Sequence, residues 1–245
     1  MSFDKNEFLS KISVVFKENG LGAMLNMEKA KAFLSLTEIM LEENEKYNLT
    51  AITEPDKIIV NHYLDCAFLA KEIKSGASVV DVGCGAGFPT LPMAILRPDI
   101  KILGVDSTAK RVNYVKAAAE ALGLENVTTL TARAEEAGAN PEMREKYDYA
   151  VARAVAAMPI LSELCLPLVK VGGKFIAMKG KNAKFELQDA KRAIPTLGGK
   201  LAFCNDIIIK GGDEELCHPL IIIDKILKTP AAYPRPYAKI LKKPL

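Results

Sequence analysis

Apolar residues recur every three or four positions through the first 75 residues, which is the spacing of one face of an α-helix. The pattern predicts a first helix that ends near Gly20, a second helix from Glu28 to Tyr47, and an amphipathic stretch over residues 58–69. Thr53 is expected to cap a helix that starts between Tyr47 and the amphipathic stretch. The sequence therefore predicts a helical extension over residues 1–75. The apolar positions of its first helix are Phe8, Leu9, Ile12, Val15 and Phe16.

From residue 76 to residue 245, short apolar runs alternate with helical patterns. The apolar runs predict strands near 78–83, 100–105, 126–131, 147–152, 173–179, 201–209 and 219–225. The segments between them predict helices near 90–97, 108–122, 159–169 and 183–193. Alternation of this kind is typical of a mostly parallel, doubly wound α/β sheet with helices on both faces.

The first predicted strand runs into a turn rich in glycine, Val79 to Pro89. Three side chains are missing within five residues, at Gly83, Gly85 and Gly87, as expected where a backbone bends sharply or approaches a ligand. A dinucleotide-binding turn requires a glycine where Phe88 stands. The observed G-x-G-x-G spacing, preceded by Asp81, instead resembles the first motif of class I S-adenosylmethionine-dependent methyltransferases. A loop that contains glycine only for packing is the alternative.

The second predicted strand ends in Asp106, about 20 residues after the glycine turn. A carboxylate at that distance is typical of a group that binds the hydroxyls of a ribose. The alternative is an ordinary acid that caps the next helix. Two carboxylates, Asp81 and Asp106, in register with the glycine turn favour a site for a nucleoside-containing cofactor.

Further polar residues follow the later strands, at the edge where a parallel sheet binds its ligands. Arg153 leaves the fourth strand among alanines and valines, which favours a functional role over a salt bridge at the rim. Lys179 and Lys181 end the fifth strand and are expected to bind phosphate. The alternative is that both are ordinary solvated lysines. Ala134 and Glu135 follow the third strand, where class I methyltransferases contact adenine; a surface turn is the alternative.

The net charge of +3 is unevenly distributed along the 245 residues. Residues 170–245 carry 15 Lys or Arg and 7 Asp or Glu, whereas the preceding residues are slightly acidic. A basic C-terminal stretch on a near-neutral body suggests contacts with nucleic-acid phosphates, or a solubilising tail. The basic residues expected to face RNA there are Arg235, Lys239, Lys242 and Lys243.

The composition also excludes several classes of protein. No apolar run reaches 18 residues, and the first residues lack a signal-peptide core, so we expect a cytoplasmic protein without a membrane segment. The five cysteines are scattered and form no C-x-x-C pair, which argues against a metal site and against a disulfide framework.

Taken together, these motifs resemble the RsmG (GidB) family of bacterial methyltransferases that act on guanine N7 of 16S ribosomal RNA. The segments that carry the resemblance run nearly from end to end: 47–52, 61–65, 81–89, 153–156, 178–180, 233–235 and 242–245. The resemblance implies a seven-stranded class I fold whose last strand is antiparallel. It also implies a monomer that binds S-adenosyl-L-methionine and the small ribosomal subunit or its RNA. Its cofactor positions fall on Gly83, Phe88, Ala134, Glu135 and Arg153, with Asp81 and Asp106 from the wider fold.

Methylation of guanine N7 requires no general base, because that nitrogen has a free lone pair and no proton. Positioning is then the main contribution to catalysis, and Arg153 is expected to bind cofactor, guanine O6 or phosphate. His62 and Asp65 are expected to form a pair on the substrate side, and a structural histidine bonded to its helix neighbour is equally consistent with their spacing. A methyltransferase for small molecules on the same fold is the main alternative, against which the basic tail argues.

Overall fold

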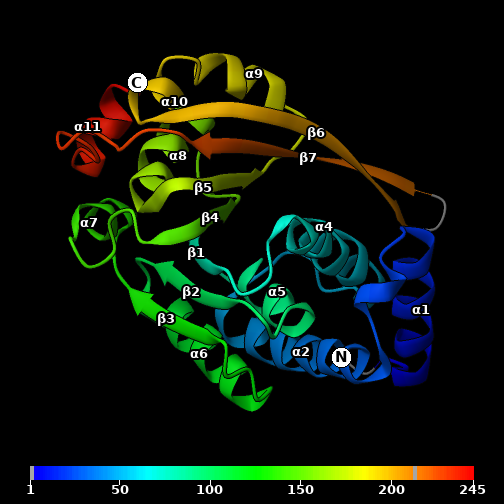
Figure 1. The fold of residues 1–245 in the computed structure, drawn as a ribbon. Coiled ribbons are helices and arrows are strands. Elements are labelled where there is room, and N and C mark those ends of the chain that lie inside the picture. Colours follow the sequence, from blue (N-terminus) through cyan, green and yellow to red (C-terminus); the bar gives the residue numbers. More distant parts are fainter. Residues whose placement is uncertain (1–2, 212–213) are drawn as a thin grey trace.

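The computed structural model describes residues 3–211 and 214–245 (Figure 1). Seven strands form one sheet in the order β3-β2-β1-β4-β5-β7-β6. Neighbouring strands among β1 to β5 pair in parallel, and β7 lies antiparallel between β5 and β6. The predicted mostly parallel α/β sheet and its antiparallel last strand are therefore confirmed. The strands are β1 Ser78–Val82, β2 Lys101–Asp106, β3 Val127–Thr131, β4 Tyr147–Arg153, β5 Val169–Met178, β6 Gly199–Gly211 and β7 Glu214–Lys225.

Helices precede the sheet and connect its strands. The N-terminal helices are α1 Lys5–Glu18, α2 Met27–Tyr47, α3 Pro55–Ile58 and α4 Asp65–Glu72, with a π-helical segment, Ile59–Leu64, that joins α3 to α4. The later helices are α5 Thr90–Leu96, α6 Ala109–Ala121, α7 Ala134–Ala139, α8 Met158–Cys165, α9 Ala183–Asp189, α10 Ala193–Thr196 and α11 Tyr237–Lys242. Two shorter 3₁₀ turns occupy Gly22–Met24 and Leu166–Leu168.

Several predicted boundaries are wrong, and prolines account for some of the errors. The helix expected over 159–169 ends at Cys165, because Pro167 cannot donate the backbone hydrogen bond that an α-helix needs there. The helix expected over 183–193 is divided into α9 and α10, and Pro195 lies in the short second one. Thr53 is not a cap: Pro55 occupies the first helical position of α3, so that Glu54 becomes the capping residue.

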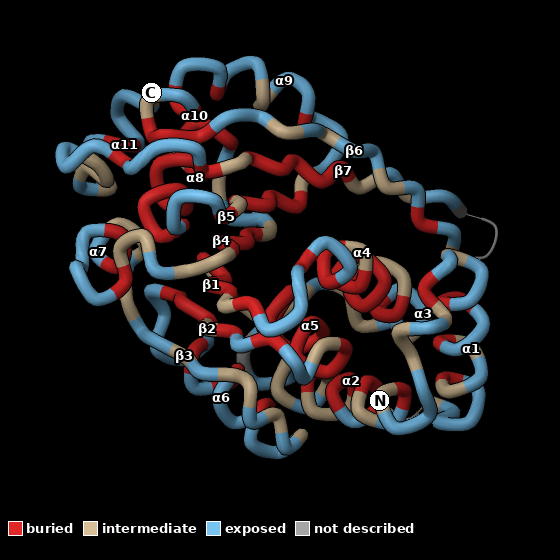
Figure 2. Tube along the Cα trace, in the orientation of Figure 1, coloured by how far each residue is buried: buried red, intermediate tan, exposed pale blue. Residues whose placement is uncertain are grey.

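The strand pattern buries both faces of the sheet, because alternate side chains point to opposite sides. Val79, Val151 and Ile222 pack against α2, α4, α5 and α6. Val80 and Ile223 pack against α8, α9 and α10 on the other face. Figure 2 shows the resulting arrangement, with buried residues along the central strands β1 and β4, more exposed residues along the edge strands β3 and β6, and exposed residues on the outer sides of the helices.

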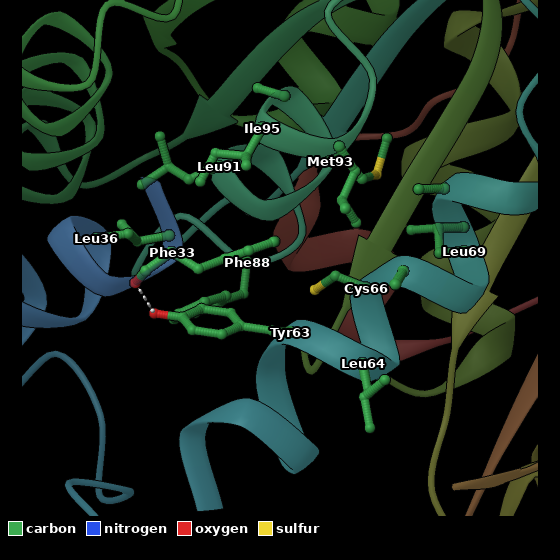
Figure 3. Packing of buried hydrophobic residues seen from close by; sticks show 14 of the residues in the cluster. Phe33, Leu36, Tyr63, Leu64, Cys66, Leu69, Phe88, Leu91, Met93 and Ile95 are labelled. Atoms are coloured by element: carbon green, nitrogen blue, oxygen red, sulfur yellow. Dashed lines mark hydrogen bonds between the residues drawn. The ribbon is translucent and has the colours of Figure 1, made fainter. Parts of the chain in front are cut away.

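The helical extension shares the first of these two hydrophobic clusters. Tyr63 of the π-helical segment is fully buried, lies 4.5 Å from Phe33 of α2 between ring centroids, and lies 6.3 Å from Phe88 of the glycine turn. Figure 3 shows these rings beside Leu91 and Met93 of α5. The N-terminal helices therefore form one continuous core with the end of the sheet that carries the glycine turn.

The β6–β7 hairpin also contacts the N-terminal extension. The side-chain amide of Asn19, which follows α1, donates to the Lys210 carbonyl at 2.9 Å. The Lys210 N–H donates in return to Asn19 Oδ1 at 2.8 Å. A Cβ added at Gly211 would lie 2.7 Å from Val60. The outer end of this hairpin is thus fixed to the opposite side of the molecule, near α1 in Figure 1.

A buried ion pair and the hydrogen bonds of a buried lysine attach the C-terminal segment to the rest of the domain. Arg235 donates from its Nε to Oε1 of Glu163 at 2.8 Å and from its Nη2 to Oε2 at 2.5 Å, and Glu163 is fully buried on α8. Lys225 is also buried and donates to the Leu166 carbonyl at 2.5 Å and to Thr229 Oγ1 at 2.6 Å. Part of the basic charge of the tail is therefore structural.

Removal of the Arg235 side chain is expected to destabilise the protein. The Arg235→Ala variant leaves the carboxylate of Glu163 buried without its cation, which costs about 3 kcal/mol in comparable cases. Urea unfolding should show this as a lower midpoint. Lys242→Ala, which removes an exposed cation of the same segment, should leave the midpoint unchanged. Equal midpoints for both variants would contradict a structural role for Arg235.

Candidate active site

The glycine turn connects β1 to α5 and lies against the ends of β2 and β4. The backbone N–H groups of Gly83 and Cys84 both donate to the Val105 carbonyl of β2, at 2.7 and 3.0 Å. Gly83 has a φ of +79°, and a Cβ there would lie 2.6 Å from Cγ2 of Val155, which follows β4. Glycine is therefore required at this position both by backbone conformation and by space.

Asp106, at the end of β2, is oriented by two backbone donors. Its Oδ2 accepts from the Gly85 N–H at 3.1 Å, and its Oδ1 accepts from the Thr108 N–H at 2.8 Å. Arg111 Nη1 lies 3.9 Å from Oδ2. The hydrogen bond from Gly85 therefore joins the glycine turn to the carboxylate of Asp106 at the end of β2.

A cavity of about 260 Å³ lies at this edge of the sheet. Asp106, Ala134 and Glu135, all predicted cofactor residues, line it together with Gly83. Tyr237 of α11 also lines the cavity, 5.9 Å from its ring centroid to the guanidinium carbon of Arg133. The sequence analysis missed Tyr237, because no local pattern indicates that the C-terminal segment returns to this edge.

Asp81 lies beneath the glycine turn and is fully buried. Its Oδ2 accepts a hydrogen bond from the Thr90 hydroxyl at 2.6 Å, whereas its Oδ1 has no hydrogen-bond partner among the described residues. Burial raises the pKa of Asp81 to about 7, and the bond from Thr90 opposes that rise. Oδ1 is thus a buried acceptor beneath the glycine turn, without a donor among the described residues.

The raised pKa of Asp81 predicts a specific pH dependence. Between about pH 4 and pH 7 the folded protein retains a proton that the unfolded chain has released, so folding becomes less favourable as pH rises. Relative to Asp81→Asn, which does not titrate, the wild-type protein should lose on the order of 4 kcal/mol of stability across that window. Urea unfolding of both proteins without cofactor at several pH values measures this difference. Parallel stability profiles would contradict the prediction.

Arg153 extends from the end of β4 to the N-terminal extension. Its Nη2 donates to the Asn61 carbonyl at 2.8 Å and to Nδ1 of His62 at 3.0 Å. Its Nε lies 3.5 Å from Oδ2 of Asp65, whose side chain is 5% exposed. Arg153 therefore connects β4 with the π-helical segment and α4.

His62 is buried and has a defined role in this cluster. Burial, reinforced by the adjacent Arg153 guanidinium, lowers the pKa of His62 to about 4, so the ring is neutral at pH 7. Because Nδ1 accepts from Arg153, the proton lies on Nε2, which is 3.3 Å from the Thr50 hydroxyl. The ring also stacks on Phe88, with 4.4 Å between centroids. His62 and Asp65 thus face Arg153, and no hydrogen bond joins the two within the described part of the chain.

A second cavity, of about 210 Å³, lies on the other side of Ala154, which also lines the first. Its lining is rich in charged groups: Asp65, Arg153, Ala154, Met178, Lys179, Gly180, Glu186 and His218. Nδ1 of His218 lies 3.2 Å from Oδ1 of Asp65, without the alignment of a hydrogen bond. The ends of β4, β5 and α4 therefore surround a polar pocket. It lies next to the first cavity, which Gly83, Asp106, Ala134 and Glu135 line.

The structure separates the basic residues expected to face RNA into two groups. Arg235 is paired with Glu163, and Lys179 donates to the Ala156 carbonyl at 2.9 Å and forms an ion pair with Glu186 Oε2 at 2.6 Å. Their charges are neutralised inside the protein. The others are exposed to solvent and remain candidates for phosphate contacts: Lys181, Lys239, Lys242 and Lys243.

Two further sequence expectations concern metals and membranes. In the part of the chain that the structure describes, no group of three or more His, Cys, Asp or Glu side chains is arranged to hold a metal ion. No helix in the ranges 3–211 and 214–245 combines the length and the apolar character needed to cross a bilayer.

The sheet order, the glycine turn and the carboxylate of Asp106 place the chain among class I S-adenosylmethionine-dependent methyltransferases. Solved structures agree on the fold. A SAM-dependent O-methyltransferase from Thermotoga maritima is similar with a TM-score of 0.53 at 16% identity, over 78% of this chain and 72% of that one. An M. jannaschii protein solved in complex with AdoMet has a TM-score of 0.52 at 16% identity, over 66% of this chain and 75% of its own.

Sequence comparison identifies the family. The model of the GidB family, described as rRNA small subunit methyltransferase G, matches residues 27–216, and the chain belongs to this family. The ribosomal RNA small subunit methyltransferase G of Clostridium perfringens is 47% identical over 93% of this chain and 95% of its own length. That of Lactobacillus delbrueckii subsp. bulgaricus is 44% identical over 90% and 93%. The resemblance noted from the sequence is thereby confirmed.

Proposed function

We propose that this protein transfers the methyl group of S-adenosyl-L-methionine to N7 of a guanine in 16S ribosomal RNA. The observation that carries the proposal is the pair of adjoining cavities in a chain of the GidB family. One cavity is lined by four of the predicted cofactor residues, Gly83, Asp106, Ala134 and Glu135. The other, which Arg153 lines, is polar and can hold a base. Because both are lined by a single chain, we propose that the monomer is sufficient, and that it acts in the cytoplasm, where its substrate would occur.

The residues present fit the cofactor. Asp106 would hold the ribose hydroxyls, Ala134 and Glu135 the adenine, and the turn at Gly83 leaves room because it lacks a side chain. When bound, S-adenosylmethionine would supply an electrophilic methyl group on its sulfonium, with the neutral thioether as the leaving group when that methyl is transferred to N7.

The chain contributes positioning and electrostatics to such a reaction, and no proton has to be removed. Arg153 is fixed by Asn61, His62 and Asp65, so its guanidinium is pre-organised in the lining of the second cavity. N7-methylguanine is cationic, and the carboxylates of Asp65 and Glu186 in the second cavity would stabilise that developing charge. Neutral His62 adds no opposing charge.

The test of this function is transfer of labelled methyl from S-adenosylmethionine to small-subunit RNA. Free 16S RNA and assembled subunits should be compared, and the labelled nucleoside identified after digestion. Label in 7-methylguanosine at one position supports the proposal. Cofactor binding without label on either RNA would contradict the substrate assignment, and absence of cofactor binding would contradict the assignment of the first cavity.

A further inference from the structure

The second cavity contains one carboxylate with an acceptor oxygen left available. Glu186 of α9 lines the cavity; its Oε2 accepts from the Met158 N–H at 3.0 Å and forms an ion pair with Lys179 Nζ at 2.6 Å. No hydrogen bond to its Oε1 occurs within the described residues. The side chain of Glu186 is 23% exposed, so this oxygen belongs to a group that is neither fully buried nor freely solvated.

The network around Glu186 fixes the orientation of the carboxylate. Lys179, whose side chain is only 9% exposed, connects Glu186 to the Ala156 carbonyl in the loop that follows β4. Met158, the first residue of α8, fixes the same Oε2 through its backbone. The Met158 N–H and Lys179 Nζ thus hold one oxygen of Glu186 in place, and the other oxygen faces the cavity without a donor among the described residues.

We propose that Oε1 of Glu186 recognises the acceptor guanine by accepting hydrogen bonds from its Watson–Crick edge, an inference that rests on the function proposed above. Guanine presents two donors on that edge, N1–H and the 2-amino group. Adenine has an acceptor at N1 and no 2-amino group, so a carboxylate oxygen placed against positions 1 and 2 of the ring would meet no donor. A buried or half-buried acceptor left unpaired in this way discriminates strongly between ligands.

The assignment is compatible with the chemistry of the transfer. N7 lies on a different edge of the purine, so a base held by Glu186 keeps its N7 lone pair free. Asp65 is less suited to this recognition, because it is 4% exposed and both of its oxygens already face cationic or histidine groups.

The test combines removal of the carboxylate with removal of one donor from the base. Small-subunit RNA is prepared by ligation with inosine at the methylated position, since inosine keeps N7 and N1–H but lacks the 2-amino group. The kcat/KM for guanosine RNA over inosine RNA is then measured for the wild-type protein and for Glu186→Ala. We expect a ratio of at least tenfold in the wild-type protein and a ratio within about twofold of one in the variant.

Two controls separate recognition from a loss of structure. Asp189→Asn removes an exposed carboxylate from the same helix and should keep the wild-type ratio. Calorimetric titration with S-adenosylmethionine should give the same affinity for Glu186→Ala as for the wild-type protein. A merely structural role for Glu186 would lower both RNA substrates equally and leave the ratio unchanged, which overturns the inference.

The outcomes also distinguish this inference from the proposed function. Methylation of guanosine and inosine RNA at equal rates by the wild-type protein would overturn the role of Glu186 and leave the N7 assignment intact. Absence of methyl transfer to the target nucleotide in both RNAs would overturn the role of Glu186 and the proposed function together. A wild-type preference for guanosine that persists in Glu186→Ala would assign base recognition to another group.

Discussion

Gly83→Ala is expected to weaken the binding of S-adenosylmethionine at least 100-fold. The added Cβ would lie 2.6 Å from Cγ2 of Val155, and the φ of +79° is unfavourable for any side chain. Either the turn or the loop after β4 must move, and both border the predicted cofactor cavity. Isothermal titration calorimetry measures the affinity, and circular dichroism during heating shows whether the fold persists.

Gly123→Ala provides the matched control for this substitution. Gly123 also has a positive φ, of +66°, but a Cβ there meets no atom within 4 Å. The backbone penalty, on the order of 1 kcal/mol, is therefore common to both variants, whereas the collision is specific to Gly83. Equal cofactor affinity in the two variants would contradict the role assigned to the glycine turn.

Arg153→Ala is expected to reduce methyl transfer at least 100-fold and to lower the stability of the protein. Asp65 would lose its nearest guanidinium while 5% exposed, and removal of one partner from a buried pair costs about 3 kcal/mol. The Asn61 carbonyl and Nδ1 of His62 would lose their donor as well. Arg153→Lys keeps the charge but cannot span all three partners, so it should recover stability more than activity.

The titration of His62 separates these two roles of Arg153. The guanidinium is the second cause, after burial, of the depressed pKa of His62. In Arg153→Ala that pKa should rise from about 4 and stay below 6.5, because burial remains. NMR of the His62 ring protons follows the change. An unchanged His62 titration would show that the two side chains are not in contact in solution.

Sequence reasoning predicted the parts of the site that are local in the chain. The glycine turn, Asp81 and Asp106 were identifiable because strand, turn and helix follow one another within a short segment, and hydrophobic periodicity marks each of them. Their placement around one turn follows from parallel strands that end at the same edge. The roles of these residues in cofactor binding remain predictions.

Contacts between distant segments were not accessible from the sequence. His62 and Asp65 are separated from Arg153 by almost 90 residues, and periodicity only indicated that they share a helix face. Their shared contact with Arg153 depends on how α4 packs on β4. Tyr237 reaches the first cavity for a similar reason, because the pairing of Arg235 with Glu163 returns the tail to that edge.

Charge in the sequence was also an incomplete guide. Lys179 and Arg235 read as solvent-exposed cations, and only the structure shows their partners, Glu186 and Glu163. A lysine in a basic stretch and a lysine in a buried ion pair have the same local pattern. The carboxylate that decides between them lies elsewhere in the chain.

The contact of the β6–β7 hairpin with Asn19 has a consequence for how the chain acquires its structure during translation. Asn19 and Lys210 are 191 positions apart, and Leu220 and Ile222 of β7 complete the core that the N-terminal helices begin. Contacts of such long range slow folding, because a large loop must close before they form. The helices that are synthesised first therefore keep apolar surface uncovered until β7 has left the ribosome, and a chain that terminates before residue 210 would be exposed to chaperones and proteases.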